Sequence, residues 1–146
     1  MDYYEDLEIG QSTSFGEYEV TAEEIVSFAQ QYDPQPFHTD PEAATESMFG
    51  GLVASGWHTA AMTMRLLVDN YINESRALGA AGVDDLRWRE PVEPGDVLSV
   101  ETEIVDKETW DERRGLVHVA ITTLNDADQP VVTMTTLVLW ERTPSN

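Results

Sequence analysis

The sequence contains no cysteine. This absence excludes disulfide bonds, thiol nucleophiles and metal sites built from thiolates. Long apolar runs are also missing, because no stretch approaches the roughly 18–20 residues of a membrane-spanning helix. The first ten residues are acidic and lack the basic start and the apolar segment of a secretory signal. We therefore expect a cytoplasmic protein with no membrane partner.

Lysine is nearly absent, since Lys107 is the only one, and eight basic residues stand against 28 acidic ones for a net charge of −20. Such a surface repels phosphate backbones, so nucleic acid is not an expected partner. An apolar content of 41%, with four Trp, five Tyr and four Phe, indicates a folded chain. Scattered acids with almost no lysine predict adaptation to high salt, where screening shortens to about 3 Å at 1 M.

The length of 146 residues fits a single domain spanning 1–146. Turn signals separate one strand near the start from four strands in the second half, with helical patterns between them. This order predicts an α+β fold in which an antiparallel sheet of about five strands wraps around one long buried helix. The expected strands cover residues 12–20, 84–92, 97–110, 115–124 and 131–140.

Residues 21–51 predict two short helices and a loop. A capping box at residues 21–24 begins a helix that runs to about Tyr32. Pro34 and Pro36 stop this helix, so residues 37–39 are expected to form a loop. Asp40 can cap a second short helix that starts at Pro41.

The long central helix is expected over residues 52–78. Residues 57–68 are apolar on nearly every face, which is typical of a buried helix. Gly79 and Gly82 are expected to end it.

The most unusual segment, residues 32–40, places Asp33 and His38 five positions apart on a stretch stiffened by two prolines. A carboxylate and an imidazole held together can share one proton-transfer step. The alternative is structural, with Asp33 capping a turn and His38 in solvent. A metal site is not expected, because His38 and His58 are not at ligand spacing on one helix.

A second candidate lies at the start of the central helix, in residues 53–58. Gly56 lets the backbone approach a ligand, and the first N–H groups of a helix can stabilise a developing oxyanion. Alternatively, Ser55 is an ordinary N-cap, Gly56 a packing glycine and His58 a core histidine. A serine hydrolase is not expected, because Ser55 lacks a base and a nucleophile elbow.

Three other residues are weaker candidates for a functional role. His118 lies within a strand and is expected to serve sheet packing or the surface. Arg87 and Arg89 share one face of a strand, where they could contact substrate phosphates or form structural ion pairs. Their role stays open from the sequence.

Asp33-x-x-Pro36-x-His38, eighteen residues before Gly56, resembles the hydratase motif of the MaoC-like, (R)-specific enoyl-CoA hydratases and acyl dehydratases. The resemblance covers nearly the whole chain and implies the hotdog fold, catalytic Asp33 and His38, an oxyanion hole at Gly56, and no cofactor. Two positions depart from the family, with Gln35 where Asn is common and Ser55 where His is common. The implied substrate-binding residues are Gln35, Pro36, Phe37, Ser55, Trp57 and His58.

The resemblance implies reversible hydration of trans-2-enoyl-CoA to (R)-3-hydroxyacyl-CoA. The alternatives are a hotdog acyl-CoA thioesterase or a non-catalytic acyl-CoA binder on the same fold, and an acidic interaction domain. A lone hotdog chain leaves an edge strand and a helix face uncovered, so a homodimer or a higher oligomer of dimers is expected.

Overall fold

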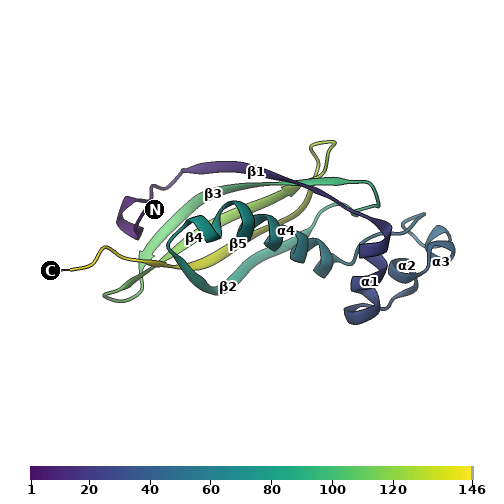
Figure 1. Cartoon of the computed structure of the whole chain (residues 1–146), viewed down its shortest axis with the longest axis horizontal. Helices are drawn as coiled ribbons and strands as arrows, with labels where there is room; N and C mark the ends of the chain where they lie inside the picture. Colours follow the sequence, from purple (N-terminus) through teal and green to yellow (C-terminus); the bar gives the residue numbers. More distant parts are fainter. Residues whose placement is uncertain (146) are drawn as a thin grey trace.

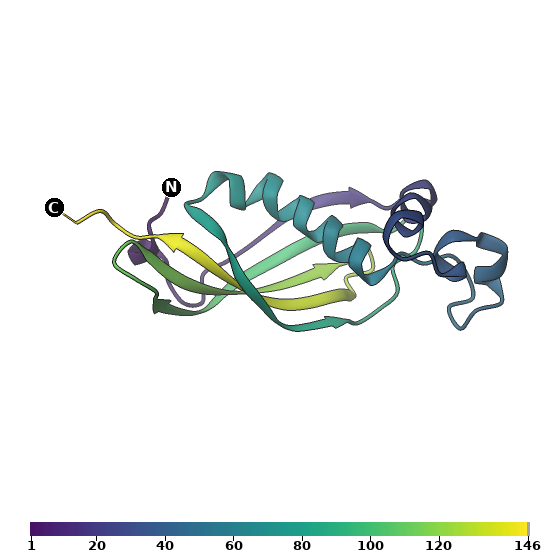
Figure 2. The same ribbon diagram turned by 90° about the horizontal axis from the view of Figure 1, so that it is seen from below.

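The computed structural model describes residues 1–145, and its core is one five-stranded antiparallel sheet in the order β1-β3-β4-β5-β2 (Figure 1). The strands are β1 (Ser12–Glu19), β2 (Ala77–Trp88), β3 (Val97–Thr109), β4 (Arg114–Leu124) and β5 (Pro130–Glu141). The main helix, α4 (Gly56–Asn70), lies along one face of this sheet (Figure 2). The α+β hotdog architecture predicted from the sequence is therefore confirmed.

The core forms where α4 meets the sheet. Met62, Leu66 and Leu67 of α4 are almost fully buried in one cluster with side chains from β3, β4 and β5. Strand β4 alternates as a half-covered strand should, since its residues 117, 119, 121 and 123 are all buried. This packing fixes the position of α4 on the sheet, and therefore of its first residue, Gly56.

The prediction of a helix over residues 52–78 was wrong at both ends, because α4 begins only at Gly56. Helix α4 stops at Asn70, a 3₁₀ turn (η2) covers Ile72–Glu74, and β2 has already begun at Ala77. Residues 77–83 are small or apolar and suit either structure locally, but pairing with β5 recruits them into the sheet. Gly79 and Gly82 therefore lie inside β2, where the register with β5 is irregular, rather than at a helix end.

The central helix is also not buried on every face. Trp57 and Met64 of α4 are 59% and 51% exposed. They lie seven residues apart, on the same side of the helix. A strip of apolar surface therefore runs along the outer side of α4.

Three short helices, α1 (Ala22–Tyr32), α2 (Pro36–Thr39) and α3 (Pro41–Thr45), gather at one end of the sheet (Figure 1). Two predicted caps are confirmed, because Thr21 accepts a hydrogen bond from the Glu24 backbone N–H and Asp40 accepts one from Glu42. The loop expected at residues 37–39 is instead the single helical turn α2. Proline suits the first position of a helix, so Pro36 starts this turn, whereas Pro34 directly follows the C-cap of α1, Asp33.

The two chain ends lie together at the opposite end of the sheet (Figure 1). The Glu5 carboxylate accepts hydrogen bonds from the Thr143 backbone N–H at 2.8 Å and from Arg142 Nε at 2.9 Å. These contacts, led by the Thr143 backbone, lower the pKa of Glu5 to about 2. No helix in residues 1–145 is long and apolar enough to cross a membrane.

Candidate active site

A cavity of about 510 Å³ opens between α2, the start of α4 and the end of β2. Six of the predicted site residues line it: Asp33, Gln35, Phe37, His38, Gly56 and Trp57. The cavity thus brings together the two segments that the sequence analysis singled out separately.

Asp33 and His38 face each other in this cavity. The single turn of α2 carries His38 back toward the end of α1, and His38 Nε2 lies 3.4 Å from Asp33 Oδ2. His38 is 6% exposed, and its Nδ1 lies 2.7 Å from the Val53 carbonyl oxygen. A carbonyl only accepts hydrogen bonds, so Nδ1 must carry the proton. In a neutral ring, Nε2 is then an acceptor that points at the carboxylate.

Asp33 is held ionised by its neighbours. Burial raises the pKa of Asp33, but the hydrogen bond that Gln35 donates, the nearby Ser55 hydroxyl and the adjacent His38 imidazole, when protonated, outweigh it, so the pKa lies below its ordinary value. The contact from Gln35 Nε2 to Asp33 Oδ1 is short, at 2.7 Å. The hydrogen bond accepted within the site therefore outweighs the effect of the apolar side chains that also line the cavity.

Gly56 is the first residue of α4, and its N–H has no hydrogen-bond partner in the described chain. Its carbonyl accepts a bond of 2.8 Å from Trp88 Nε1. A Cβ at this position would lie 2.4 Å from the Trp88 ring, so only glycine fits beneath the indole. The free N–H at a helix start, within the cavity, can receive a negatively charged oxygen.

The remaining predicted residues do not line the cavity. Pro36 begins α2 and acts through that turn. Ser55 is fully buried, and its hydroxyl lies near Asp33 without a well-aligned hydrogen bond. His58 stacks on Phe28 with ring centroids 4.7 Å apart, and burial lowers its pKa. His58 thus packs as a core histidine, the alternative left open by the sequence.

Sequence reasoning missed Trp88 entirely. Its ring packs edge-on against Trp57, with centroids 5.1 Å apart, and both rings line the cavity. The only available signal was an aromatic residue next to the noted arginines, of which Arg89 also lines the cavity. Other lining residues missed from the sequence are Met48, Phe49, Val53, Ala54, Thr59, Glu90, Pro91 and Val92.

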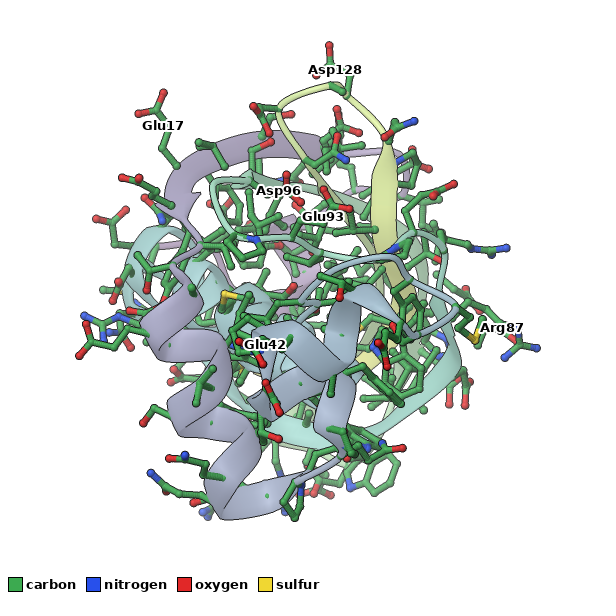
Figure 3. All side chains as sticks on the ribbon, turned by 90° about the vertical axis from the view of Figure 1, so that its right-hand side faces the viewer. Glu17, Glu42, Arg87, Glu93, Asp96 and Asp128 are labelled. Atoms are coloured by element: carbon green, nitrogen blue, oxygen red, sulfur yellow. The ribbon has the colours of Figure 1, made fainter. Side chains whose placement is uncertain are left out.

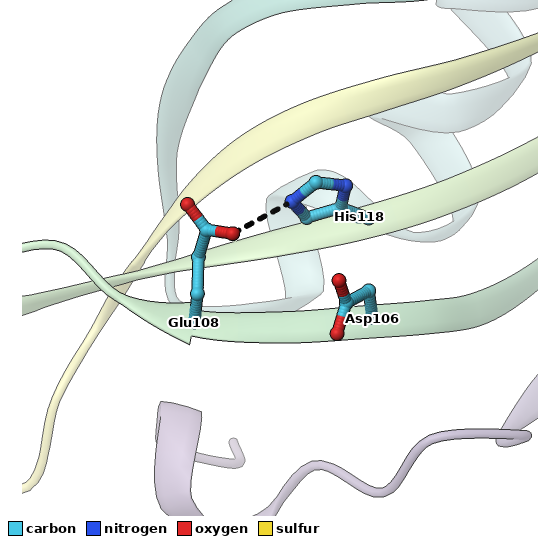
Figure 4. Close-up of side chains that lie close together, drawn as sticks. All are labelled: Asp106, Glu108 and His118. Atoms are coloured by element: carbon cyan, nitrogen blue, oxygen red, sulfur yellow. Dashed lines mark ion pairs between the residues drawn. The ribbon is translucent and has the colours of Figure 1, made fainter.

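His118 belongs to a different cluster, beside Asp106 and Glu108 on β3 and β4 (Figure 4). Its Nε2 lies 3.5 Å from a Glu108 carboxylate oxygen, and both carboxylates are exposed. The surface role expected for His118 agrees with this position, and none of the three residues of this cluster lines the cavity that holds Asp33.

Comparisons with known proteins agree with this geometry. The family model described as "MaoC like domain" matches residues 6–125. A crystal structure of a MaoC-like dehydratase from Rhodospirillum rubrum is 42% identical, with a TM-score of 0.89 over 99% of this chain and all of that one. The unliganded R-hydratase PhaJ1 from Pseudomonas aeruginosa is 25% identical, with a TM-score of 0.77 over 97% of this chain and 86% of that one. The uncharacterized protein YdeM of Bacillus subtilis is 28% identical over 87% of this chain and 90% of its own length.

Proposed function

The chain belongs to the MaoC-like domain family, and we propose that it catalyses the reversible hydration of a trans-2-enoyl-CoA to the (R)-3-hydroxyacyl-CoA. One observation carries this proposal above the others. Asp33 Oδ2 and His38 Nε2, which is an acceptor when the ring is neutral, face each other at 3.4 Å in the cavity that Gly56 also lines. The names of the similar dehydratase and R-hydratase give it further support.

The facing acceptors suit one water molecule. A water that donates one hydrogen to Asp33 Oδ2 and the other to His38 Nε2 satisfies both groups and presents its oxygen lone pair to the substrate. Attack at the β-carbon forms the C–O bond and pushes electrons onto the thioester oxygen. The Gly56 N–H would stabilise that oxygen as charge develops.

No proton is gained or lost overall at Asp33 and His38 during the reaction. The Asp33–His38 pair accepts one proton from the attacking water and delivers it to the α-carbon as the enolate collapses. The net result is addition of one water across the double bond, with no cofactor required. Because both groups stand on one side of the cavity, addition takes place on one face of the substrate and gives a single enantiomer.

The competing activities on this fold are thioester hydrolysis and binding without catalysis. Hydration removes the absorbance of the conjugated enoyl thioester and releases no thiol, whereas hydrolysis releases free coenzyme A. Following both signals on a panel of enoyl-CoA thioesters in molar salt tests the proposal. Release of thiol without prior hydration, or no reaction on any chain length, would count against it.

Replacing Gln35 with alanine is expected to move the acid limb of the kcat/KM profile to higher pH. The bond from Gln35 Nε2 lowers the pKa of Asp33, so its loss lets that pKa rise, and the general base then becomes protonated at a less acidic pH. Rates above the limb should change little. The measurement is kcat/KM against pH for Gln35→Ala and for Gln30→Ala, an exposed glutamine on α1. An unmoved limb in Gln35→Ala would show that this contact does not tune the base.

We also propose that the active form is a twofold dimer built on β2 and α4. Strand β2 is an edge of the sheet, twelve residues long, and leaves backbone groups unpaired. Leu78 and Val83 of β2 and Met64 of α4 are each at least half exposed, so this face of the molecule is apolar. Light scattering in molar salt should give twice the chain mass of 16.4 kDa, and a single species of one chain mass would contradict the dimer.

A further inference from the structure

Most basic side chains of this acidic protein already form hydrogen bonds or ion pairs within the chain. Lys107 donates from Nζ to the Leu7 carbonyl and lies over the Tyr4 ring. Four arginines form ion pairs with carboxylates at 2.6–3.1 Å: Arg65, Arg76, Arg114 and Arg142. Within residues 1–145, three arginines have no carboxylate within ion-pair distance: Arg87, Arg89 and Arg113.

Two of these three unpaired arginines lie together at the candidate site. Arg89, just after the end of β2, lines the cavity that holds Asp33 and Gly56. Arg87 lies two residues earlier, opposite Thr133 of β5, and its side chain projects outward beyond the ribbon (Figure 3).

The Arg89 guanidinium is oriented by the protein. Its Nε donates a hydrogen bond of 3.0 Å to Thr133 Oγ1 on the neighbouring strand. That bond uses the inner N–H and leaves both terminal nitrogens without a partner in the described chain. A guanidinium with both terminal nitrogens free can donate hydrogen bonds to two oxygens of one phosphate group.

The surrounding charge makes this arrangement selective. Glu90 lines the same cavity and opposes any anion, and the chain as a whole carries a net charge of −20. A general positive field therefore cannot draw a phosphate to this end of the molecule. Only direct contact with an unpaired guanidinium can hold one there.

We propose that Arg89, supported by Arg87, binds a phosphate group of the coenzyme A carrier and so selects for the full carrier over shorter thioesters. The inference rests on the proposed function, which places the thioester at Gly56 and the enoyl group beside Asp33. The carrier must then leave the cavity past Trp57 and Trp88, which are 59% and 46% exposed, to reach Arg89. Their rings offer apolar surface to the uncharged arm between the thioester and the phosphates.

The test compares three thioesters of one enoyl chain: coenzyme A, 3′-dephospho-coenzyme A and N-acetylcysteamine, which ends before any phosphate. Arg89→Gln should lower kcat/KM for the coenzyme A thioester about tenfold, as expected for a lost charged hydrogen bond. It should lower kcat/KM for the N-acetylcysteamine thioester by a clearly smaller factor. If the loss disappears with the 3′-dephospho carrier, the contact is to the 3′-phosphate; if it persists, the contact is to the diphosphate.

Arg113→Gln is the matched control, because it removes the same charge from an unpaired arginine that lines a different cavity. It should keep the wild-type ratio between the thioesters. Equal losses on all three thioesters in Arg89→Gln, or no loss with coenzyme A, would overturn the proposal. If kcat/KM for the coenzyme A thioester falls further in the Arg87→Gln/Arg89→Gln double variant, Arg87 also contacts the phosphate. If kcat/KM does not fall further, Arg87 takes no part in the contact.

Calorimetric binding of coenzyme A itself separates this inference from the proposed function. The dissociation constant should rise about tenfold in Arg89→Gln and stay unchanged in Arg113→Gln. If the wild type hydrates no thioester but binds coenzyme A through Arg89, the hydratase proposal fails and the phosphate contact stands. If it hydrates enoyl-CoA and Arg89→Gln affects neither affinity nor kcat/KM, the phosphate contact fails alone.

Discussion

Asp33→Asn is expected to lower kcat for enoyl-CoA hydration by about 10²–10⁴-fold, the usual contribution of a positioned general base. Asparagine is nearly the same size and can still accept the bond from Gln35 Nε2, so the site should keep its shape. It cannot take a proton from water, so only the chemical step is lost. The substrate KM should therefore change far less than kcat.

The measurement is steady-state hydration by Asp33→Asn, with the circular dichroism spectrum and Tm recorded on the same preparation. Asp69→Asn is the matched control, because Asp69 is a half-exposed aspartate paired with Arg65 on the surface of α4, outside the cavity. It should retain wild-type kcat. A folded Asp33→Asn protein with near wild-type turnover would remove Asp33 from the reaction.

His38→Ala is expected to lower kcat by a similar factor, about 10²–10⁴-fold, and also to lower the Tm. The two losses have separate causes. The Nε2 atom faces Asp33, where under the proposed mechanism it would hold the water, whereas Nδ1 donates a hydrogen bond to the Val53 carbonyl in a buried position. Removing the ring leaves that carbonyl unpaired, which costs about 1–3 kcal/mol of unfolding free energy.

The paired control is His118→Ala, which removes a histidine from the outer cluster on β3 and β4. It should retain kcat, because this cluster does not line the cavity. Measuring both Tm and kcat on the two variants distinguishes a loss of stability from a loss of catalysis. Full hydration activity in a folded His38→Ala protein would rule out a part for the imidazole.

The candidate site was predictable where its parts are close in the sequence. Asp33 and His38 stand five residues apart with two prolines between them, so the local sequence already indicated that they lie near each other. Gly56 was recognisable because a helix start is a local feature. The antiparallel strands other than β2 were recognisable for the same reason, since alternation and turn residues mark each of them.

The features that could not be predicted depend on contacts between residues that are distant in the sequence or on side-chain orientation. Residues 77–83 became strand because β5, more than fifty positions later, pairs with them. Trp88 donates a hydrogen bond to Gly56 from 32 residues away, and no local sequence pattern near either residue predicts this contact. The direction of the pKa shift of Asp33 depends on how Gln35 and Ser55 orient toward it, which the spacing in the sequence does not reveal.

The edge-on packing of Trp57 against Trp88 has a practical use. These rings are two of only four tryptophans in the chain, and both line the cavity. Indole fluorescence depends on solvent contact and on nearby quenching groups, and a bound acyl carrier would alter both around this pair. Half of the indole rings of the unmodified protein therefore lie in the cavity wall, so binding in the cavity can be followed by tryptophan fluorescence without attaching a dye.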